Sequence, residues 1–331
     1  MKLGGLVALL VGLALLGAVI AHSDLALVGQ LLSRLSFTGA LAVLGLFTLA
    51  WAAEIGAWAL TFTQRALRLT WLWQLWLVNM VGEAMNVVMP FGSLGGEPVK
   101  AWLLKKHYAI GYREVTVTLI LMQTLLAVAE AIFVSIGALL AVQLAILPVR
   151  VADLLSGAAV SLLLLMALAI IAMHQRWLRH ALAAFERRHN SARYAAAKRA
   201  LDDIELELAE FARGRPRRFA ASTLLYFLNW AGGAAEVWLL LKLLDAALPF
   251  SHCWVAEAAV VSIRSLTFFL PAQLGSVEAV TVYVIGALGG STEIGLALAA
   301  LRRARELAWA VLGLGVGTAY HLDWRGATKS S

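Results

Sequence analysis

Two short segments of the chain share a pattern that could bind a charged group in an apolar environment. In each, a proline follows a long apolar run, and glycine and then glutamate follow the proline, with the glutamate seven positions after it. The residues are Pro90, Gly95, Gly96 and Glu97 in the first segment and Pro271, Gly275 and Glu278 in the second. Proline interrupts a helix, so each break leaves backbone groups without helical partners, and the helix that follows can present N–H groups to an anion. We therefore expect the prolines and glycines to act as hinges around a binding site.

Charged and polar side chains gather near both breaks. The candidate ligands are Glu83, Asn86, Glu97 and Lys100 around the first break, and Glu278, Arg303 and Arg305 around or beyond the second. At about 1.5 Å per residue, Arg305 lies roughly 16 Å into the last apolar segment. A lone charge at that depth of a membrane costs on the order of 3 kcal/mol, so it must pair or face a hydrated cavity.

The last apolar segment also allows a local ion pair. Arg302 and Glu306 are four positions apart, so we expect them to pair on one helix face. Arg303 and Arg305 then remain for other partners. These partners are expected to be Glu97, Glu278 or an anionic ligand.

The composition identifies the environment of these residues. Of 331 residues, 61% are hydrophobic and 14% are charged, and the mean hydropathy is +0.81. Soluble domains carry about 45–50% apolar and about 25% charged residues. These values exclude a soluble fold and a disordered chain, and they predict an all-α, polytopic integral membrane protein. The net charge of +7 then indicates loops beside anionic lipid, with no nucleic acid as partner.

Apolar segments long enough to cross a membrane predict about six full spans plus two re-entrant helical hairpins. The full spans are expected at residues 3–21, 35–62, 115–147, 151–173, 219–244 and 294–320. The first hairpin begins with 71–89 and turns back at Pro90. The second is formed by 254–270 and 276–288, with its break at Pro271.

The distribution of basic residues predicts an inverted repeat. The polar stretch 174–218 is basic and amphipathic, and basic loops favour the cytoplasmic side. If 71–89 crossed the membrane fully, Lys100, Lys105 and Lys106 would lie outside, against this rule. We therefore expect one transmembrane domain, 1–331, in which repeat one (1–173) and repeat two (219–331) flank a cytoplasmic linker (174–218). Both termini are then cytoplasmic.

The sequence shows little sign of catalysis or of a bound cofactor. The single cysteine, Cys253, excludes a disulfide framework, and the seven histidines are scattered without metal-ligand spacing. A phosphate-binding loop of the Walker type is absent, so the chain does not use nucleotide by itself. We expect no metal, no cofactor and no enzymatic activity.

Several motifs bear a family resemblance. Residues 86–90 (NVVMP) with 94–104 (LGGEPVKAWLL) resemble the lysylphosphatidylglycerol synthetase transmembrane-domain family, also called flippase-like. Residues 274–278 (LGSVE) and 302–307 (RRAREL) are similar to its hopanoid-biosynthesis-associated branch. Relatives often carry a charged pair in the helix after the first hairpin, where this chain has Met122, Gln123 and Thr124.

The resemblance implies a bacterial inner-membrane protein that moves lipids between leaflets or towards the outer membrane. Hopanoids are the favoured cargo and phospholipids the next, and lipid-biosynthetic or envelope transport proteins are further expected partners. The aminoacyl-transferase domain that follows this region in the synthetases is not expected here. Two alternatives stay open: a non-transporting scaffold for lipid-biosynthetic enzymes that acts through 174–218, and an intramembrane enzyme that uses glutamates as acid and base.

Overall fold

The helical architecture is given by a computed structural model. It describes residues 25–88, 95–174, 206–207, 210–211, 213–268, 270 and 273–319. Within these ranges the regular structure is helical and contains no strand. The predicted all-α class is confirmed, and Pro90, Pro271 and most of the predicted linker 174–218 lie outside the described residues.

Most of the described helices follow one another through short connections, whereas the long stretch 175–215 separates α7 from α10. They are α2 (Leu25–Ser33), α3 (Phe37–Thr61), α4 (Leu69–Val88), α5 (Gly96–Tyr108), α6 (Tyr112–Gln143), α7 (Val149–His174), α10 (Pro216–Leu243), α11 (Phe250–Leu266), α12 (Ser276–Ala287) and α13 (Thr292–Ala319). Among the described residues, α3, α6 and α10 are long and apolar enough to cross a membrane by themselves. The chain is a multi-pass membrane protein, as its composition predicts.

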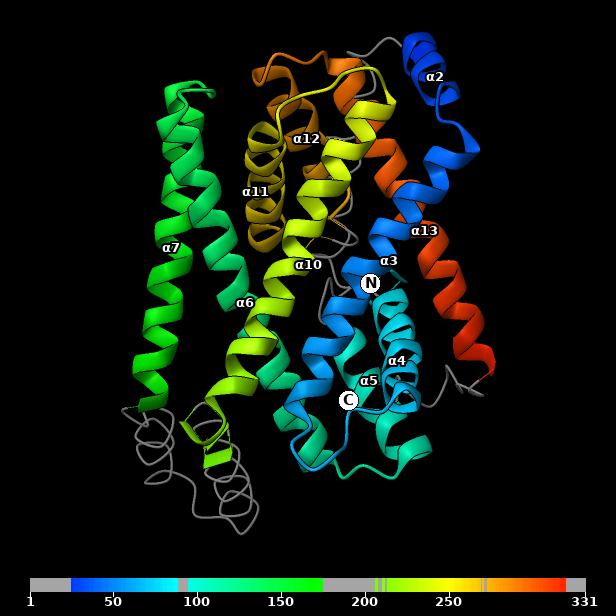
Figure 1. Cartoon of the computed structure of the whole chain (residues 1–331), viewed down its shortest axis with the longest axis vertical. Helices are drawn as coiled ribbons and strands as arrows, with labels where there is room; N and C mark the ends of the chain where they lie inside the picture. Colours follow the sequence, from blue (N-terminus) through cyan, green and yellow to red (C-terminus); the bar gives the residue numbers. More distant parts are fainter. Residues whose placement is uncertain are drawn as a thin grey trace, which may run out of the picture.

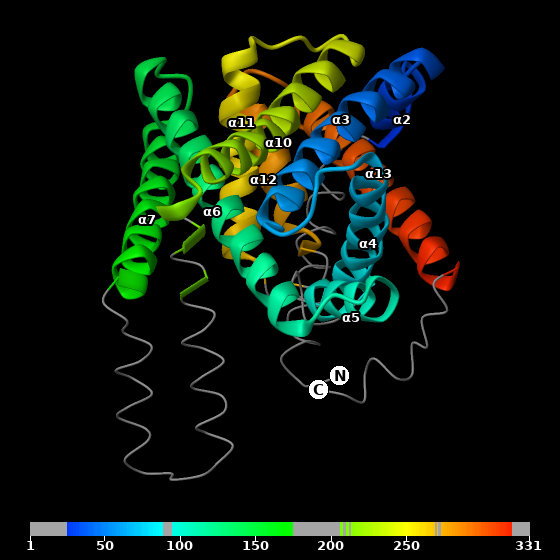
Figure 2. The same cartoon turned by 60° about the horizontal axis from the view of Figure 1, so that its bottom comes forward.

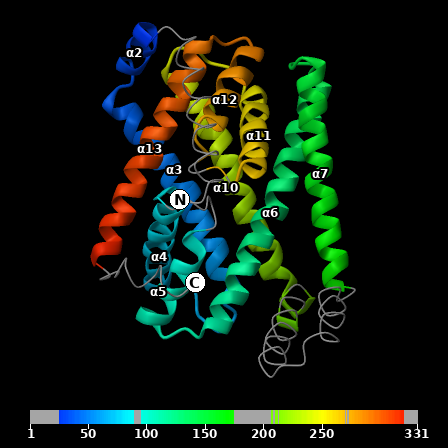
Figure 3. The ribbon, with the colours of Figure 1, turned by 180° about the vertical axis from the view of Figure 1, so that it is seen from behind.

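Two helical hairpins lie at opposite ends of the molecule. Helices α4 and α5 pack together in the lower half of Figure 1, and α11 and α12 pack together in the upper half. The view from behind shows the same arrangement (Figure 3). The two hairpins have equivalent neighbours. Helix α4 of the first hairpin packs on α13, and helix α11 of the second hairpin packs on α6, while the long helices α3 and α10 pack on each other. This is the arrangement expected of two oppositely directed hairpins, while the repeat boundaries stay a prediction.

Two predicted segments end earlier than expected. The segment predicted at 115–147 leaves the helix after Gln143, where Ala145 adopts a left-handed conformation (φ 49°). The segment predicted at 254–270 begins at Phe250, because Pro249 sets the helix start, and ends at Leu266. Hydrophobicity alone marked the apolar stretch in both cases, whereas backbone geometry determined the helix ends.

Close helix contacts hold the hairpins in place. A Cβ atom on Gly96 would lie 2.2 Å from the carbonyl oxygen of Gly82, and one on Gly313 would lie 2.4 Å from that of Met80. Glycine is therefore required for α5 and α13 to approach α4 so closely. Buried apolar side chains such as Leu75 pack between α3, α4, α5 and α6, and a second cluster joins α6, α10 and α11. Helix α7 lies at one edge of the molecule beside α6, with α13 at the opposite edge (Figure 2).

Candidate functional site

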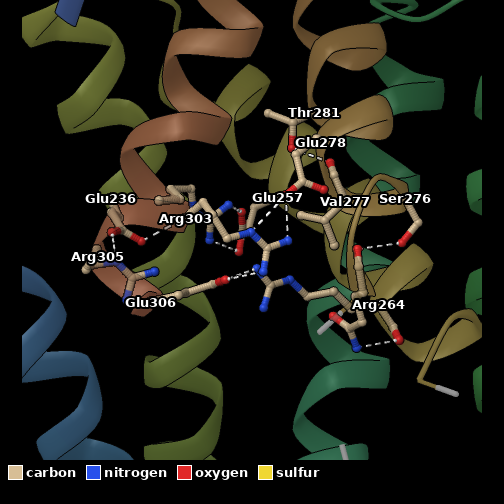
Figure 4. Close-up of polar contacts among 12 residues, drawn as sticks. Glu236, Glu257, Arg264, Ser276, Val277, Glu278, Thr281, Arg303, Arg305 and Glu306 are labelled. Atoms are coloured by element: carbon tan, nitrogen blue, oxygen red, sulfur yellow. Dashed lines mark hydrogen bonds and ion pairs between the residues drawn. The ribbon is translucent and has the colours of Figure 1, made fainter. Parts of the chain in front are cut away.

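Ion pairs connect the second hairpin to α13 (Figure 4). Arg303 on α13 donates from Nε and Nη2 to Glu278 Oε1 on α12, at 2.8 and 2.5 Å, and from Nη1 to Glu306 Oε2 at 3.1 Å. Arg264, near the end of α11, donates to Glu306 Oε1 at 2.7 Å. A continuous series of ion pairs therefore joins α11 and α12, the two arms of the hairpin, to α13.

A second ion pair lies deeper in the same region. Arg302 donates two parallel hydrogen bonds to Glu257 on α11, at 2.6 and 2.8 Å, and its Nε lies 3.5 Å from Glu236 Oε2 on α10. The Arg302–Glu306 pair expected from spacing does not form. The bidentate geometry explains this, because a planar guanidinium bonds a facing carboxylate more strongly than a neighbour along its own helix. Glu257 was missed, although an acid inside the apolar run 254–270 is itself a signal.

Arg305 lies beside the same acids and keeps donors that no described residue uses. Its Nε lies 2.7 Å from Glu236 Oε1, and its guanidinium carbon lies 3.8 Å above the Phe47 ring. The side chain is only 10% exposed. Its two terminal nitrogens donate no hydrogen bond within the described part of the chain, so they can bind an anion.

Polar contacts also close the first hairpin. Lys100 is buried and its Nζ donates to Glu83 Oε1 at 2.8 Å and to Glu97 Oε1 at 3.0 Å. Asn86 Nδ2 donates to Glu83 Oε2 at 3.2 Å, and Asn86 Oδ1 accepts a 2.7 Å hydrogen bond from the Gly96 backbone N–H. These contacts bridge α4 and α5 on either side of the break.

The two hairpin glutamates occupy corresponding places with different partners. Glu97 and Glu278 both lie in the first turn of the returning helix. Glu97 accepts from Gln123 Nε2 at 3.2 Å, 26 positions later, whereas Glu278 accepts from Arg303, 25 positions later. A neutral amide thus stands in the first half where the second half has a guanidinium.

The glycines beside these glutamates differ in their conformations. Gly275 has φ 78°, a conformation that favours glycine, and its N–H donates to Glu278 Oε2 at 2.8 Å. Gly95 precedes α5 with helical angles, and Gly96 begins α5. Gly275 therefore allows a backbone turn, whereas Gly96 allows a close contact between helices.

A cavity of about 240 Å³ lies between the two hairpins. Residues from α3, α4, α13 and the second hairpin line it: Phe47, Trp51, Glu83, Ala84, Asn86, Val87, Arg264, Gln273, Arg303, Arg305, Glu306, Trp309 and Ala310. One wall is aromatic, since the Trp309 ring centroid lies 5.1 Å from that of Phe47 and 5.4 Å from that of Trp51. No sequence signal marked these three rings as neighbours.

The structure separates the predicted site residues into three groups. Glu83, Asn86, Arg303 and Arg305 line the central cavity. Lys100 and Glu278 do not line it, but each contacts a residue that does. Glu97 instead lines a separate groove of about 430 Å³ between α5 and α6.

A comparison with known families identifies the family of this chain. The family described as Lysylphosphatidylglycerol synthase TM region matches residues 5–315. The chain belongs to this family. No curated protein and no solved structure matches the chain. Membership indicates a membrane protein with a lipid-related function and confirms the resemblance at the family level, while the hopanoid branch stays a prediction.

Proposed function

We propose that this protein moves a lipid between the leaflets of a membrane by passing the polar headgroup through the central cavity. One observation supports this most directly: charged residues of both hairpins line a single cavity beside an aromatic wall. A headgroup that leaves water loses its hydration, so a path through the apolar interior needs fixed polar groups in place of water. We propose no enzymatic step.

The cavity offers charges of both signs. The terminal nitrogens of Arg305, which no described residue uses as donors, suit an anionic part of a headgroup. Glu83, whose side chain is 36% exposed, suits a hydroxyl or a cationic part. Two largely apolar grooves, of about 430 Å³ between α5 and α6 and about 740 Å³ between α7 and α11, could hold the apolar part of the lipid. The headgroup then travels inside while the apolar part stays near the bilayer.

The distribution of basic residues between the two ends of the molecule supports an orientation in the membrane. The end that holds the α3–α4 and α5–α6 connections and the start of α10 is rich in basic residues: Arg65, Arg68, Lys105, Lys106, Arg113, Arg213, Arg215, Arg217 and Arg218. Two of these contact aromatic rings, since Lys105 Nζ lies 3.9 Å from the Tyr112 ring centroid and Lys106 Nζ lies 4.4 Å from that of Trp102. We propose that this end is cytoplasmic, in a bacterial inner membrane, with both termini on the same side.

The cargo that we propose first is a hopanoid, with a phospholipid second, and this order rests on the sequence resemblance. The experiment compares the movement of labelled hopanoid and labelled phospholipid in vesicles that contain the purified full chain. The double variant Glu97→Gln/Arg305→Gln should lose most of the movement, and Arg34→Gln, at an exposed surface pair, should retain it. Equal rates in the double variant and the wild type would contradict the proposed site. A scaffold role would then be favoured.

A further inference from the structure

The two charge networks differ in their balance of acid and base. Within the described residues, the second network sets four arginines against four glutamates: Arg264, Arg302, Arg303 and Arg305 against Glu236, Glu257, Glu278 and Glu306 (Figure 4). The first network sets Glu54, Glu83 and Glu97 against the single ammonium of Lys100. Full ionisation would leave two uncompensated negative charges among membrane helices, where such charges are costly.

Within the first network, Glu54 is the acid with the weakest compensation. It lies on α3 and its Oε1 accepts a 3.0 Å hydrogen bond from Asn79 Nδ2 on α4. It forms no ion pair with any described residue, whereas Glu83 and Glu97 both contact Lys100. A neutral amide cannot offset a full negative charge, so Glu54 needs a positive charge from elsewhere.

Oxygens without a hydrogen-bond partner lie on residues that interact with Glu54. Asn79 and Tyr226 are fully buried, and the Asn79 Oδ1 atom and the Tyr226 hydroxyl have no hydrogen-bond partner among the described residues. Tyr226, on α10, interacts electrostatically with both Glu54 and Glu97. Glu97 Oε2 is likewise buried without a partner. The Tyr226 hydroxyl can donate as well as accept, whereas Asn79 Oδ1 and an ionised Glu97 Oε2 can only accept. At least two acceptors of this region therefore lack a donated hydrogen within the described residues.

A proton satisfies these needs together. Bound to Glu54, it removes one negative charge and converts the carboxylate into a donor for a neighbouring oxygen. A metal cation would also suit oxygen ligands, but it would lie in the same cluster as the ammonium of Lys100, which repels it. The groups that face Glu54 are Asn79 and Glu83 on α4, Glu97 and Lys100 on α5, and Tyr226 on α10.

We propose that Glu54 binds an exchangeable proton and that this proton moves together with the lipid. The proton is taken from water on one side of the membrane and released to water on the other, and no other bond changes. The connection to the cargo is Glu83, which contacts Lys100 and also lines the central cavity. When a headgroup draws the side chain of Lys100 or Glu83 towards the cavity, the electrostatic potential at the Glu54 carboxylate changes. This coupling rests on the proposed function, whereas the proton site itself does not.

The proton site is tested on the purified full chain by infrared spectroscopy across a pH titration. The wild type should show a protonated-carboxyl band that disappears as the pH rises. Glu54→Gln, which is neutral and of equal size, should lack this band, and Asp245→Asn, at an exposed position between α10 and α11, should retain it. Tyr226→Phe should keep the band at a shifted frequency. Two results would overturn the proposal. One is an unchanged band in Glu54→Gln. The other is a wild-type spectrum that lacks the band and responds to sodium but not to choline.

The coupling is tested in vesicles of phosphatidylethanolamine and phosphatidylglycerol with a trapped pH dye and a fluorescent phosphatidylglycerol tracer. At one proton per lipid, a gradient of one pH unit sustains about a tenfold tracer ratio between leaflets. Glu54→Gln should lose this response, and Asp245→Asn should keep it. Tracer movement that ignores the gradient in the wild type refutes the coupling. No tracer movement under any condition, with the hopanoid probe also immobile, refutes the proposed function while the infrared result stands.

Discussion

Replacing Arg302 by methionine tests whether the buried ion pair stabilises the second half of the protein. The side chains of Arg302 and Glu257 are only 9% and 4% exposed, and two short hydrogen bonds join them. Arg302→Met leaves Glu257 as a buried charge without its partner. Such a change costs about 3–5 kcal/mol of the free energy of unfolding, because the remaining carboxylate keeps its desolvation penalty.

The measurement is equilibrium unfolding in detergent, followed by the fluorescence of the 12 tryptophans. Arg34→Met is a matched control, because Arg34 lies 3.5 Å from Asp245 in a pair whose side chains are 49% and 76% exposed. An exposed pair contributes about 0–1 kcal/mol, so this control should change the free energy of unfolding little.

A double variant separates the loss of a pair from the loss of packing. Arg302→Met/Glu257→Met removes both charges and should recover most of the stability, since buried pairs often exchange for apolar residues at little cost. Glu236 keeps its contact with Arg305 in this variant. The reasoning is refuted if Arg302→Met costs no more than Arg34→Met, or if the double variant costs the sum of the two single changes.

Three further changes test the packing, the first hairpin and the cavity. Gly313→Ala forces a Cβ atom against the Met80 carbonyl and should cost about 1–3 kcal/mol in the same unfolding assay. Its control is Gly45→Ala, at a position with open space around it, which should change the free energy of unfolding by no more than about 0.5 kcal/mol. Lys100→Met leaves the partly buried carboxylates of Glu83 and Glu97 without their ammonium and should cost about 1–3 kcal/mol. Adding Glu83→Gln should recover part of this loss, and the absence of any recovery would argue that packing explains it. Arg305→Lys keeps the charge but removes the planar group above Phe47, so native mass spectrometry should show lipid affinity reduced by about tenfold, or about 1.4 kcal/mol, and an unchanged affinity would show that charge alone suffices.

Much of the architecture could be predicted from local patterns. Composition predicted the helical membrane class, and the family motifs predicted the family that matches residues 5–315. The two proline–glycine–glutamate segments predicted paired hairpins, and glutamates do lie in the first turn of α5 and α12. These features are local, because a break in an apolar helix and an acid beside it are visible within a few residues.

The pairing of the charges was decided by the tertiary structure. Spacing favoured Arg302 with Glu306, yet Arg302 bonds Glu257, 45 positions away, and Glu306 bonds Arg264 and Arg303. A contact between neighbours on one helix is worth a few tenths of a kcal/mol, whereas a bidentate pair in a dry interior is much stronger.

The two halves of the chain also differ in how their buried charges are compensated. Local sequence was enough to show that both hairpins contain charges that cannot remain alone in a membrane. Only the packing of distant helices decided that the arginines of α13 balance the acids around the second hairpin, while the acids of the first share Lys100. The physical reason is that charge compensation acts through space over a few ångströms, and neighbours in space here lie up to 45 positions apart in the chain.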